Sequence, residues 1–208
     1  LPYLTPTVRS MVLVQRYTGM RPGELCAMRP RDILRSGETW VYRPKEHKTA
    51  HHGRERVVAI GPRAQAIIAP LVEGLAPDAH VFDPAKSVEE WYAMKRAVRK
   101  TKVQPSQANR KKSTRDRKLP AAVRFERRTY AASVASAIRR QNRDAARHDV
   151  PAGQCGPNLL QCPHWHPHQI RHTHATEVRK KFGLEAAGAA LGHARMSATE
   201  VYAERDQG

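Results

Sequence analysis

Four separated segments of the sequence carry residue types that could together cleave a phosphodiester. They are residues 18–25 with Arg21, residues 168–172 with His168 and Arg171, residues 191–193 with His193, and Tyr202 nine residues later. Arginine keeps its charge at any physiological pH and can direct paired N–H donors at phosphate oxygens. Histidine can move protons, and a tyrosine oxygen can attack phosphorus and hold it as an ester. The set predicts transesterification at a phosphate with a tyrosine nucleophile.

These segments resemble the motifs of tyrosine recombinases, the phage integrase family of enzymes that exchange DNA strands at specific sites. The resemblance keeps the family order and covers nearly the whole chain. It implies a mainly α fold with a small three-stranded antiparallel sheet, an α+β catalytic domain shared with type IB topoisomerases. It also implies that Arg21 and Arg171 hold the phosphate, that His168 and His193 bind its oxygens and assist proton movement, and that Tyr202 is the nucleophile.

Three further residues are assigned from the same resemblance. Lys48 resembles the lysine of the family's β-hairpin, which donates a proton to the departing 5′-hydroxyl, and Lys45 is the competing candidate. Lys48 is favoured because its Lys-Thr pair precedes a glycine turn and a strand-like run. Glu24 matches an acidic position that orients neighbouring basic groups, although a first-turn acid also stabilises a helix through its dipole. His172, beside Arg171, is assigned a supporting role.

Tyr202 stands apart from the other tyrosines because it alone follows Leu-Gly-His at the family's short spacing. Tyr17, Tyr42, Tyr92 and Tyr130 lie in apolar stripes or strand-like runs, so we expect them in the core or at its boundary. A phenol has an unperturbed pKa of about 10, so attack at neutral pH requires nearby positive charge or a base.

The charge of the chain predicts a polyanionic partner. There are 37 Lys and Arg against 19 Asp and Glu, a formal net charge of +18, and the sequence pI is about 10.5. Between residues 95 and 147, eighteen Lys and Arg face three acids, so the charge is concentrated. With the motifs, this favours double-stranded DNA over a membrane surface. The expected DNA contacts are Lys95, Arg96, Arg99, Lys100, Lys111, Lys112, Arg124, Arg127 and Arg128.

Other features indicate a cytoplasmic, nucleoid-associated protein without metal or cofactor. No apolar run is long enough to span a bilayer, and no secretion signal opens the sequence. The odd cysteine count argues for reduced thiols. By type, Cys155, Cys162, His164 and His166 could bind zinc, but they lack a Cys-x-x-Cys pair, and alternate histidines point apart in an extended segment. We therefore predict no metal site.

Periodicity and end signals predict the elements that carry these residues. A helix over residues 5–17, ended by Gly19, and a short helix over 22–28 place Arg21 at their junction. Strand-like runs at 39–43 and 54–60 flank the Lys48 segment. Ser87 is expected to cap a helix over 87–100, and His168 and Arg171 share one helix face. The remaining helices are expected over 62–75, 121–148, 167–182, 186–191 and 197–205. Gly183 directly follows the helix over 167–182 and is expected to end it.

One catalytic domain is expected over residues 1–208, without the N-terminal core-binding domain that family members usually carry. Residues 101–120 are expected to form a basic insertion or mobile linker, and residues 149–165 a Cys-containing loop. By resemblance, four protomers assemble on paired DNA sites, and the chain is a monomer or weak oligomer without DNA.

The sequence thus predicts a site-specific DNA recombinase or integrase that cuts and rejoins strands through a 3′-phosphotyrosyl intermediate, without ATP or metal. One alternative is a type IB topoisomerase-like enzyme, which uses the same chemistry to relax DNA. A second alternative is a DNA-binding protein of the same fold that has lost its activity.

Overall fold

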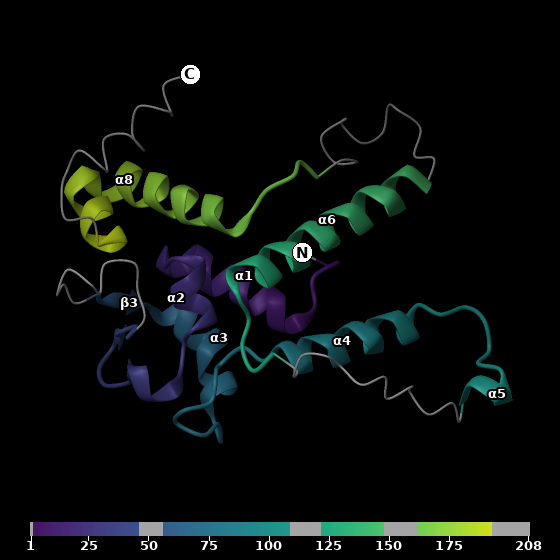
Figure 1. Cartoon of the computed structure of the whole chain (residues 1–208). Helices are drawn as coiled ribbons and strands as arrows, with labels where there is room; N and C mark the ends of the chain where they lie inside the picture. Colours follow the sequence, from purple (N-terminus) through teal and green to yellow (C-terminus); the bar gives the residue numbers. More distant parts are fainter. Residues whose placement is uncertain (1, 46–55, 109–121, 148–161, 193–208) are drawn as a thin grey trace.

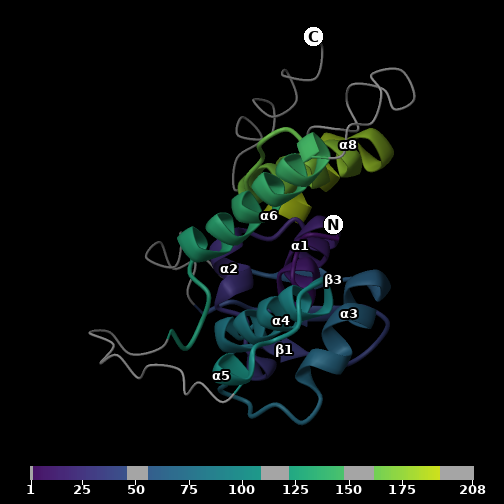
Figure 2. The same cartoon turned by 90° about the vertical axis from the view of Figure 1, so that its right-hand side faces the viewer.

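A computed structural model describes residues 2–45, 56–108, 122–147 and 162–192 (Figure 1). Helix α1 (Pro6–Thr18) lies at the centre and contacts most other elements. Figures 1 and 2 show α6 (Arg127–Arg147) and α8 (Pro167–Leu191) on one side of α1. On the other side lie α3 (Pro62–Val72), α4 (Pro84–Ala97) and the sheet. The shorter elements are α2 (Pro22–Cys26), the 3-10 helix η1 (Pro30–Asp32) and α5 (Pro105–Ala108).

The sequence of α1 accounts for its central position, because buried side chains cover more than one of its faces. Val8, Met11 and Val14 are at most 1% exposed, and further turns bury polar side chains such as Gln15. A helix with apolar residues on several faces must be covered from several sides. The core therefore assembles around α1.

The ends of α1 lie where the sequence predicts. Thr5 caps the N-terminus, with its hydroxyl accepting a hydrogen bond from the Val8 amide at 3.4 Å. The Glu90 carboxylate of α4 accepts two more bonds, from the Thr7 amide at 2.8 Å and the Thr7 hydroxyl at 2.9 Å. At the other end Gly19 has φ of 63°, the left-handed conformation that favours glycine.

The small antiparallel sheet confirms the expected fold class. It contains β1 (Ile33–Leu34), β2 (Trp40–Tyr42) and β3 (Val58–Ile60) in the order β1-β2-β3, with Tyr42 opposite Val58. The buried Tyr42 hydroxyl donates to the Glu24 backbone carbonyl at 2.7 Å, which ties the sheet to α2. The connection between β2 and β3 includes Lys48, which lies outside the described residues.

The start of α4 corrects one expectation. The helix begins at Pro84 and its cap is Asp83, whose carboxylate accepts from the Ala85 amide at 2.7 Å. Ser87 lies inside the helix and its hydroxyl bonds to that of Thr5 at 2.8 Å, so it links α4 to α1. Serine and aspartate both suit an N-cap position. The contact between Ser87 and Thr5 places Ser87 inside the helix and leaves Asp83 as the cap.

The basic middle of the chain is described in part. Residues 101–106 are exposed and lead into α5, whereas 109–121 lie outside the described residues, so the expected linker at 101–120 is only partly visible. The long basic helix is confirmed as α6, although it begins at Arg127, six residues later than the pattern predicted.

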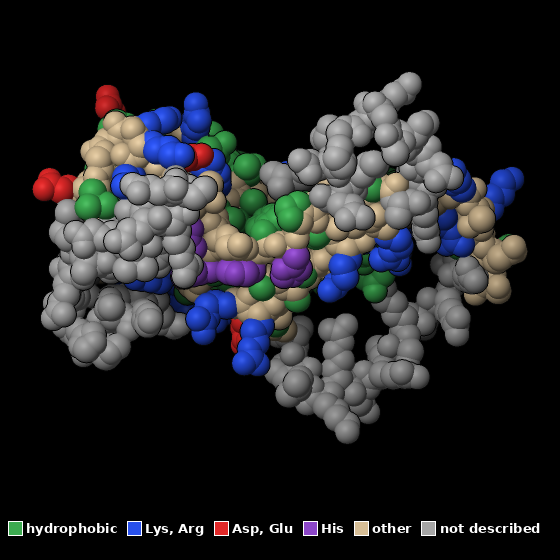
Figure 3. Space-filling view, turned by 90° about the horizontal axis from the view of Figure 1, so that it is seen from above, with side chains coloured by type: hydrophobic (Ala, Val, Ile, Leu, Met, Phe, Trp, Pro, Cys, Tyr) green, Lys and Arg blue, Asp and Glu red, His purple; other side chains and the backbone are tan. Residues whose placement is uncertain are grey.

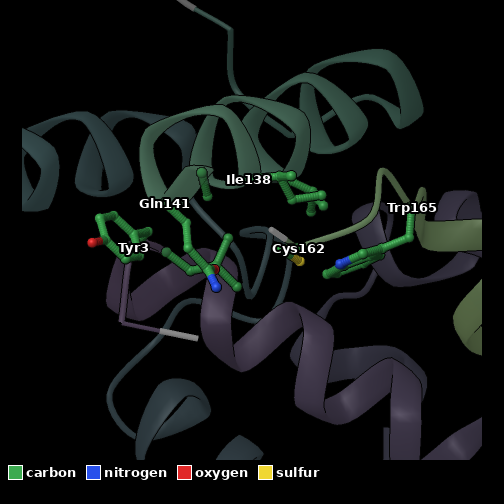
Figure 4. Close-up of a pocket in the computed structure, with 8 residues that line it drawn as sticks. Tyr3, Ile138, Gln141, Cys162 and Trp165 are labelled. Carbon is green, nitrogen blue, oxygen red and sulfur yellow. The ribbon is translucent and has the colours of Figure 1, made fainter. Parts of the chain in front are cut away.

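The last residues of the expected Cys-containing loop at 149–165 are anchored on α6, while residues 148–161 are not described. The Asn142 side chain donates to the Cys162 carbonyl at 3.0 Å and accepts from its amide at 2.8 Å. Figure 4 shows Cys162 and Trp165 at one end of a pocket of roughly 200 Å³ and Tyr3 at the other, beneath α6. These contacts hold the segment that leads into α8 against α6.

Helix α8 consists of two helical parts, as the sequence predicts. Gly183 has φ of 88° and ψ of 176°, which breaks the helix between residues 167–182 and 184–191. Figure 1 shows the second part folding back under the first. The first part packs on α1, where Arg16 and Glu177 form an ion pair and His174 Nδ1 lies 3.0 Å from the Arg16 carbonyl.

His174 makes the α1–α8 contact sensitive to pH. Burial lowers the pKa of its imidazole below the ordinary value of 6.5, although the bond to the Arg16 carbonyl opposes the shift. The unfolded chain therefore binds the proton more readily than the folded chain. The stabilisation is complete above a pH of about 6.5 and is lost as the pH falls through the folded-state pKa.

We expect urea unfolding to show a free energy that falls from pH 7 toward pH 5 more steeply in the wild type than in His174→Gln. Glutamine has no titrating group, so it removes this contribution. His164→Gln, at an exposed position before α8, is the matched control and should keep the wild-type slope. Equal slopes for the wild type and His174→Gln would contradict the assignment.

Candidate active site

The turn that carries Arg21 is held from three directions. Gln15 of α1 donates its side-chain amide to the Met20 carbonyl at 3.1 Å, and Arg171 of α8 donates to the Gly19 carbonyl at 2.6 Å. The His174 ring lies against Gly19 so closely that a Cβ there would be 2.3 Å from Cδ2. Glycine is thus required at residue 19 both by φ and by space.

Arg21 itself is partly open to solvent and is oriented by Glu24. Its Nη1 donates to Glu24 Oε1 at 2.8 Å, and its backbone amide donates to Oε2 at 2.9 Å. The Arg21 side chain is 22% exposed, whereas that of Glu24 is 2% exposed. One carboxylate therefore both caps α2 and orients the Arg21 guanidinium, while the supporting role of Glu24 in catalysis stays a prediction.

Arg56 joins this cluster, and the sequence reasoning did not assign it. Its side chain is 4% exposed and its Nε lies 3.6 Å from Glu24 Oε1, so Glu24 stands between two guanidinium groups. Burial lowers the pKa of Arg56, the Glu24 carboxylate opposes this, and the charge of Arg21 adds to it. The sequence offered one signal for a buried Arg56, because it lies two positions before Val58 of β3, which is buried. That signal was weak because the chain contains many other arginines.

Arg171 is buried, with 2% exposure, and it lies between two helix ends. Its Nη1 donates to the Gly19 carbonyl and its Nη2 to the Leu191 carbonyl, both at 2.6 Å. Carbonyls at helix C-termini carry partial negative charge, so a cation is stable there. The structure therefore brings Arg171 against the turn that carries Arg21, about 150 residues away in the sequence.

Gly192 ends α8 within the same cluster. It has φ of 64°, and a Cβ on it would lie 2.2 Å from Arg56 Nη1. Arg56 Nη2 also donates to the Ala190 carbonyl at 3.4 Å. The chain thus reaches His193 directly after a turn that two buried arginines hold.

The described histidines differ in their surroundings. His168 is exposed near the start of α8, and its ring meets that of His172 edge to face at 5.0 Å. Although His168 and Arg171 are three residues apart, one faces solvent and the other the core. Figure 3 shows histidines gathered near the middle of one face, beside Lys and Arg. The exposed His168 is accessible to a ligand, and its catalytic role stays a prediction.

Three predicted catalytic residues, Lys48, His193 and Tyr202, lie outside the described residues. The other tyrosines named in the sequence analysis are described. Tyr42 and Tyr130 are fully buried, whereas Tyr17 and Tyr92 are 39% and 46% exposed, at the boundary of the core. Burial raises the pKa of Tyr130, and its hydroxyl donates to Gln15 at 3.1 Å.

The predicted DNA-binding residues fall into two groups. Arg127 and Arg128 are the first two residues of α6, and Arg124 lies three residues before it. The Arg127 Cδ is 3.4 Å from the position of a Cβ on Gly23 in α2. The end of α4 leads toward α5, away from α2 and α8 (Figure 1). It carries Lys95 and Arg96, followed by Arg99 and Lys100, and all four are exposed. Lys111 and Lys112 are not described.

Within the described ranges, no three His, Cys, Asp or Glu side chains are placed to hold a metal ion, and Cys155 falls outside those ranges. Cys26 is buried in the core, and burial raises the pKa of its thiol to about 12. Among the same residues, no helix has both the length and the apolar character needed to cross a membrane.

The solved structures that share this fold include the three that follow. The XerA recombinase has a TM-score of 0.56 and 17% identity, covering 95% of this chain and 51% of that one. The Tn1549 transposon integrase in complex with circular intermediate DNA has a TM-score of 0.54 and 12% identity, with coverages of 93% and 54%. The XerH site-specific recombinase bound to its difH substrate has a TM-score of 0.51 and 15% identity, with coverages of 95% and 42%.

This chain spans about half the length of those proteins. A comparison with curated proteins found no match. The family model described as the phage integrase family matches residues 4–208, which is nearly the entire sequence. With the fold and the arginine cluster described above, this match shows that the chain belongs to the phage integrase family.

Proposed function

We propose that this chain is the catalytic part of a site-specific DNA recombinase that cuts and rejoins strands through a 3′-phosphotyrosyl bond. The observation that carries the proposal is the convergence of Arg21 and Arg171 on one turn, where Arg171 donates to the Gly19 carbonyl at 2.6 Å. Two guanidinium groups, those of Arg21 and Arg56, lie against a single carboxylate, Glu24, and Arg171 adds a third positive charge at the adjoining turn. This excess of positive charge suits a phosphate.

In the proposed reaction, the Tyr202 oxygen attacks phosphorus and the bond from phosphorus to the 5′-oxygen breaks. Arg21 and Arg171 would neutralise the two non-bridging oxygens as charge develops on them. Lys48 would give a proton to the departing 5′-oxygen, and His168 and His193 would bind phosphate oxygens and assist removal of the phenol proton. A 5′-hydroxyl from a partner strand reverses the attack, so the ester conserves the energy of the cleaved bond.

Double-stranded DNA is the proposed partner, with four protomers on paired sites as the working assembly. The start of α6 supports the DNA proposal, because Arg127 and Arg128 are exposed there and the Arg127 side chain lies against Gly23 of α2, two residues from Arg21. A cytoplasmic, nucleoid-associated location follows from the same proposal.

The first prediction concerns the nucleophile, and it uses a pool of nicked duplexes with a randomised central stretch because the target site is not known. The wild type should form DNA adducts that resist denaturant, and Tyr202→Phe should form none while still retarding DNA on a native gel. Tyr17→Phe removes the hydroxyl of a partly exposed tyrosine and should form adducts normally. An adduct with Tyr202→Phe would overturn the assignment.

The second prediction separates recombination from topoisomerase activity. Sequencing the trapped duplexes yields the preferred site, which is then placed in pairs on linear DNA and omitted from a supercoiled plasmid. We expect strand-exchange junctions only between paired sites, and no relaxation of the plasmid. Relaxation without site preference would favour the topoisomerase-like alternative. Sequence-selective binding without any adduct would favour the catalytically silent one.

The third prediction concerns phosphate contacts. If several Lys and Arg neutralise phosphates, affinity should fall by about a thousandfold or more between 50 and 200 mM salt. Arg127→Ala and Arg128→Ala should each reduce the slope of log affinity against log salt by about one. Arg31→Ala is the matched control, because Arg31 already pairs with Asp78, and it should leave the slope unchanged. A salt-insensitive affinity would contradict the proposed phosphate contacts at the start of α6.

A further inference from the structure

Arg56 occupies a position that its burial alone does not explain. A buried guanidinium is costly unless its donors are satisfied, and the Arg56 side chain is only 4% exposed. Its Nε is buried without a hydrogen-bond acceptor among the described residues, and it lies 3.6 Å from Glu24 Oε1. The same Oε1 accepts from Arg21 Nη1 at 2.8 Å. One carboxylate oxygen is therefore placed between two cations, bonded to one and just beyond bonding distance of the other.

Arg56 also reaches the end of α8. Its Nη2 donates to the Ala190 carbonyl at 3.4 Å, and its Nη1 fills the space that a Cβ on Gly192 would need. A single side chain thus connects the carboxylate that orients Arg21 with the turn that precedes His193.

We propose that Arg56 is a positioning residue with two roles. It pairs with the Glu24 carboxylate when Arg21 turns to a DNA phosphate, and it holds the turn at residues 190–192 at a fixed position relative to Arg21. The inference rests on the proposed function, because it assigns Arg56 to the same reaction. Arg21 is the more exposed partner, at 22%, so it is the one that can leave Glu24 for a ligand.

The physical need for this exchange is electrostatic. A phosphate at Arg21 competes with Glu24 for the same guanidinium, and a buried carboxylate left without a cation is strongly destabilising. It would also repel the phosphate in a site of low effective dielectric. A shift of a few tenths of an ångström brings Glu24 Oε1 within hydrogen-bond distance of the Arg56 Nε, which satisfies both groups.

The test uses the duplex isolated by adduct trapping and measures adduct formation in a single turnover. Arg56→Met should slow this step about a hundredfold, as expected for misplaced catalytic groups, with little change in DNA affinity. Arg56→Lys keeps the charge and should recover part of the rate. Arg9→Met is the matched control and should react at the wild-type rate. The Arg9 Nε is also buried with no acceptor in the described part of the chain, but it lies on α1.

A double-mutant cycle decides whether Arg56 acts through Glu24. In a Glu24→Gln background, Arg56→Met should cost at least tenfold less than in the wild type, since no carboxylate remains to be neutralised. Additive losses would overturn the proposal. So would an equal loss of rate in Arg9→Met, which would indicate general destabilisation.

Hydrogen exchange provides a readout without catalysis. The amides of residues 186–192 should exchange faster in Arg56→Met than in Arg9→Met, because the α8 turn loses its contact. Unchanged exchange would overturn the link to α8. Absence of adducts with the wild type on every duplex would instead refute the proposed function, and the exchange result would still test the contact.

Discussion

The position of Arg171 is the constraint on which the rest of this site depends. A buried guanidinium needs acceptors, and here these are the Gly19 carbonyl at the end of α1 and the Leu191 carbonyl at the end of α8. Neither carbonyl has a hydrogen-bond partner within its own helix, because the helices stop there. One side chain therefore bonds to carbonyls at two helix C-termini and is stabilised by both helix dipoles. The turn before Arg21 and the turn before His193 are thereby brought to the same place.

Glycines make this arrangement possible at three turns. Gly19 accommodates the His174 ring, Gly192 accommodates the Arg56 guanidinium, and Gly183 reverses the chain so that Leu191 returns to Arg171. All three have positive φ, which L-residues with a Cβ rarely adopt. The short motifs around Arg21 and His193 therefore also serve packing, since their glycines allow the His174 ring and the Arg56 guanidinium to lie against the backbone.

Sequence alone predicted the elements that depend on local signals. The Thr5 cap, the helix ends at Gly19 and Gly183 and the antiparallel strands on either side of Lys48 were found because each has a residue of special conformational preference. Features set by tertiary contact were missed. Ser87 was predicted to cap α4, but Asp83 caps it, because both residue types suit the role and Ser87 instead lies inside the helix, bonded to Thr5. Arg56 was overlooked because burial, not residue type, separates it from the many solvated arginines.

The core is also connected to the site through polar side chains. Tyr130 of α6 donates to Gln15 at 3.1 Å, and Gln15 donates to the Met20 carbonyl at 3.1 Å, one residue before Arg21. Buried polar groups of this kind are stable only when every member is satisfied, so the chain of bonds has a narrow range of geometries. Helix α6 also carries Arg127 and Arg128 at its start. Hydrogen bonds therefore connect the helix proposed to contact DNA with the turn that precedes the arginine proposed to hold the phosphate.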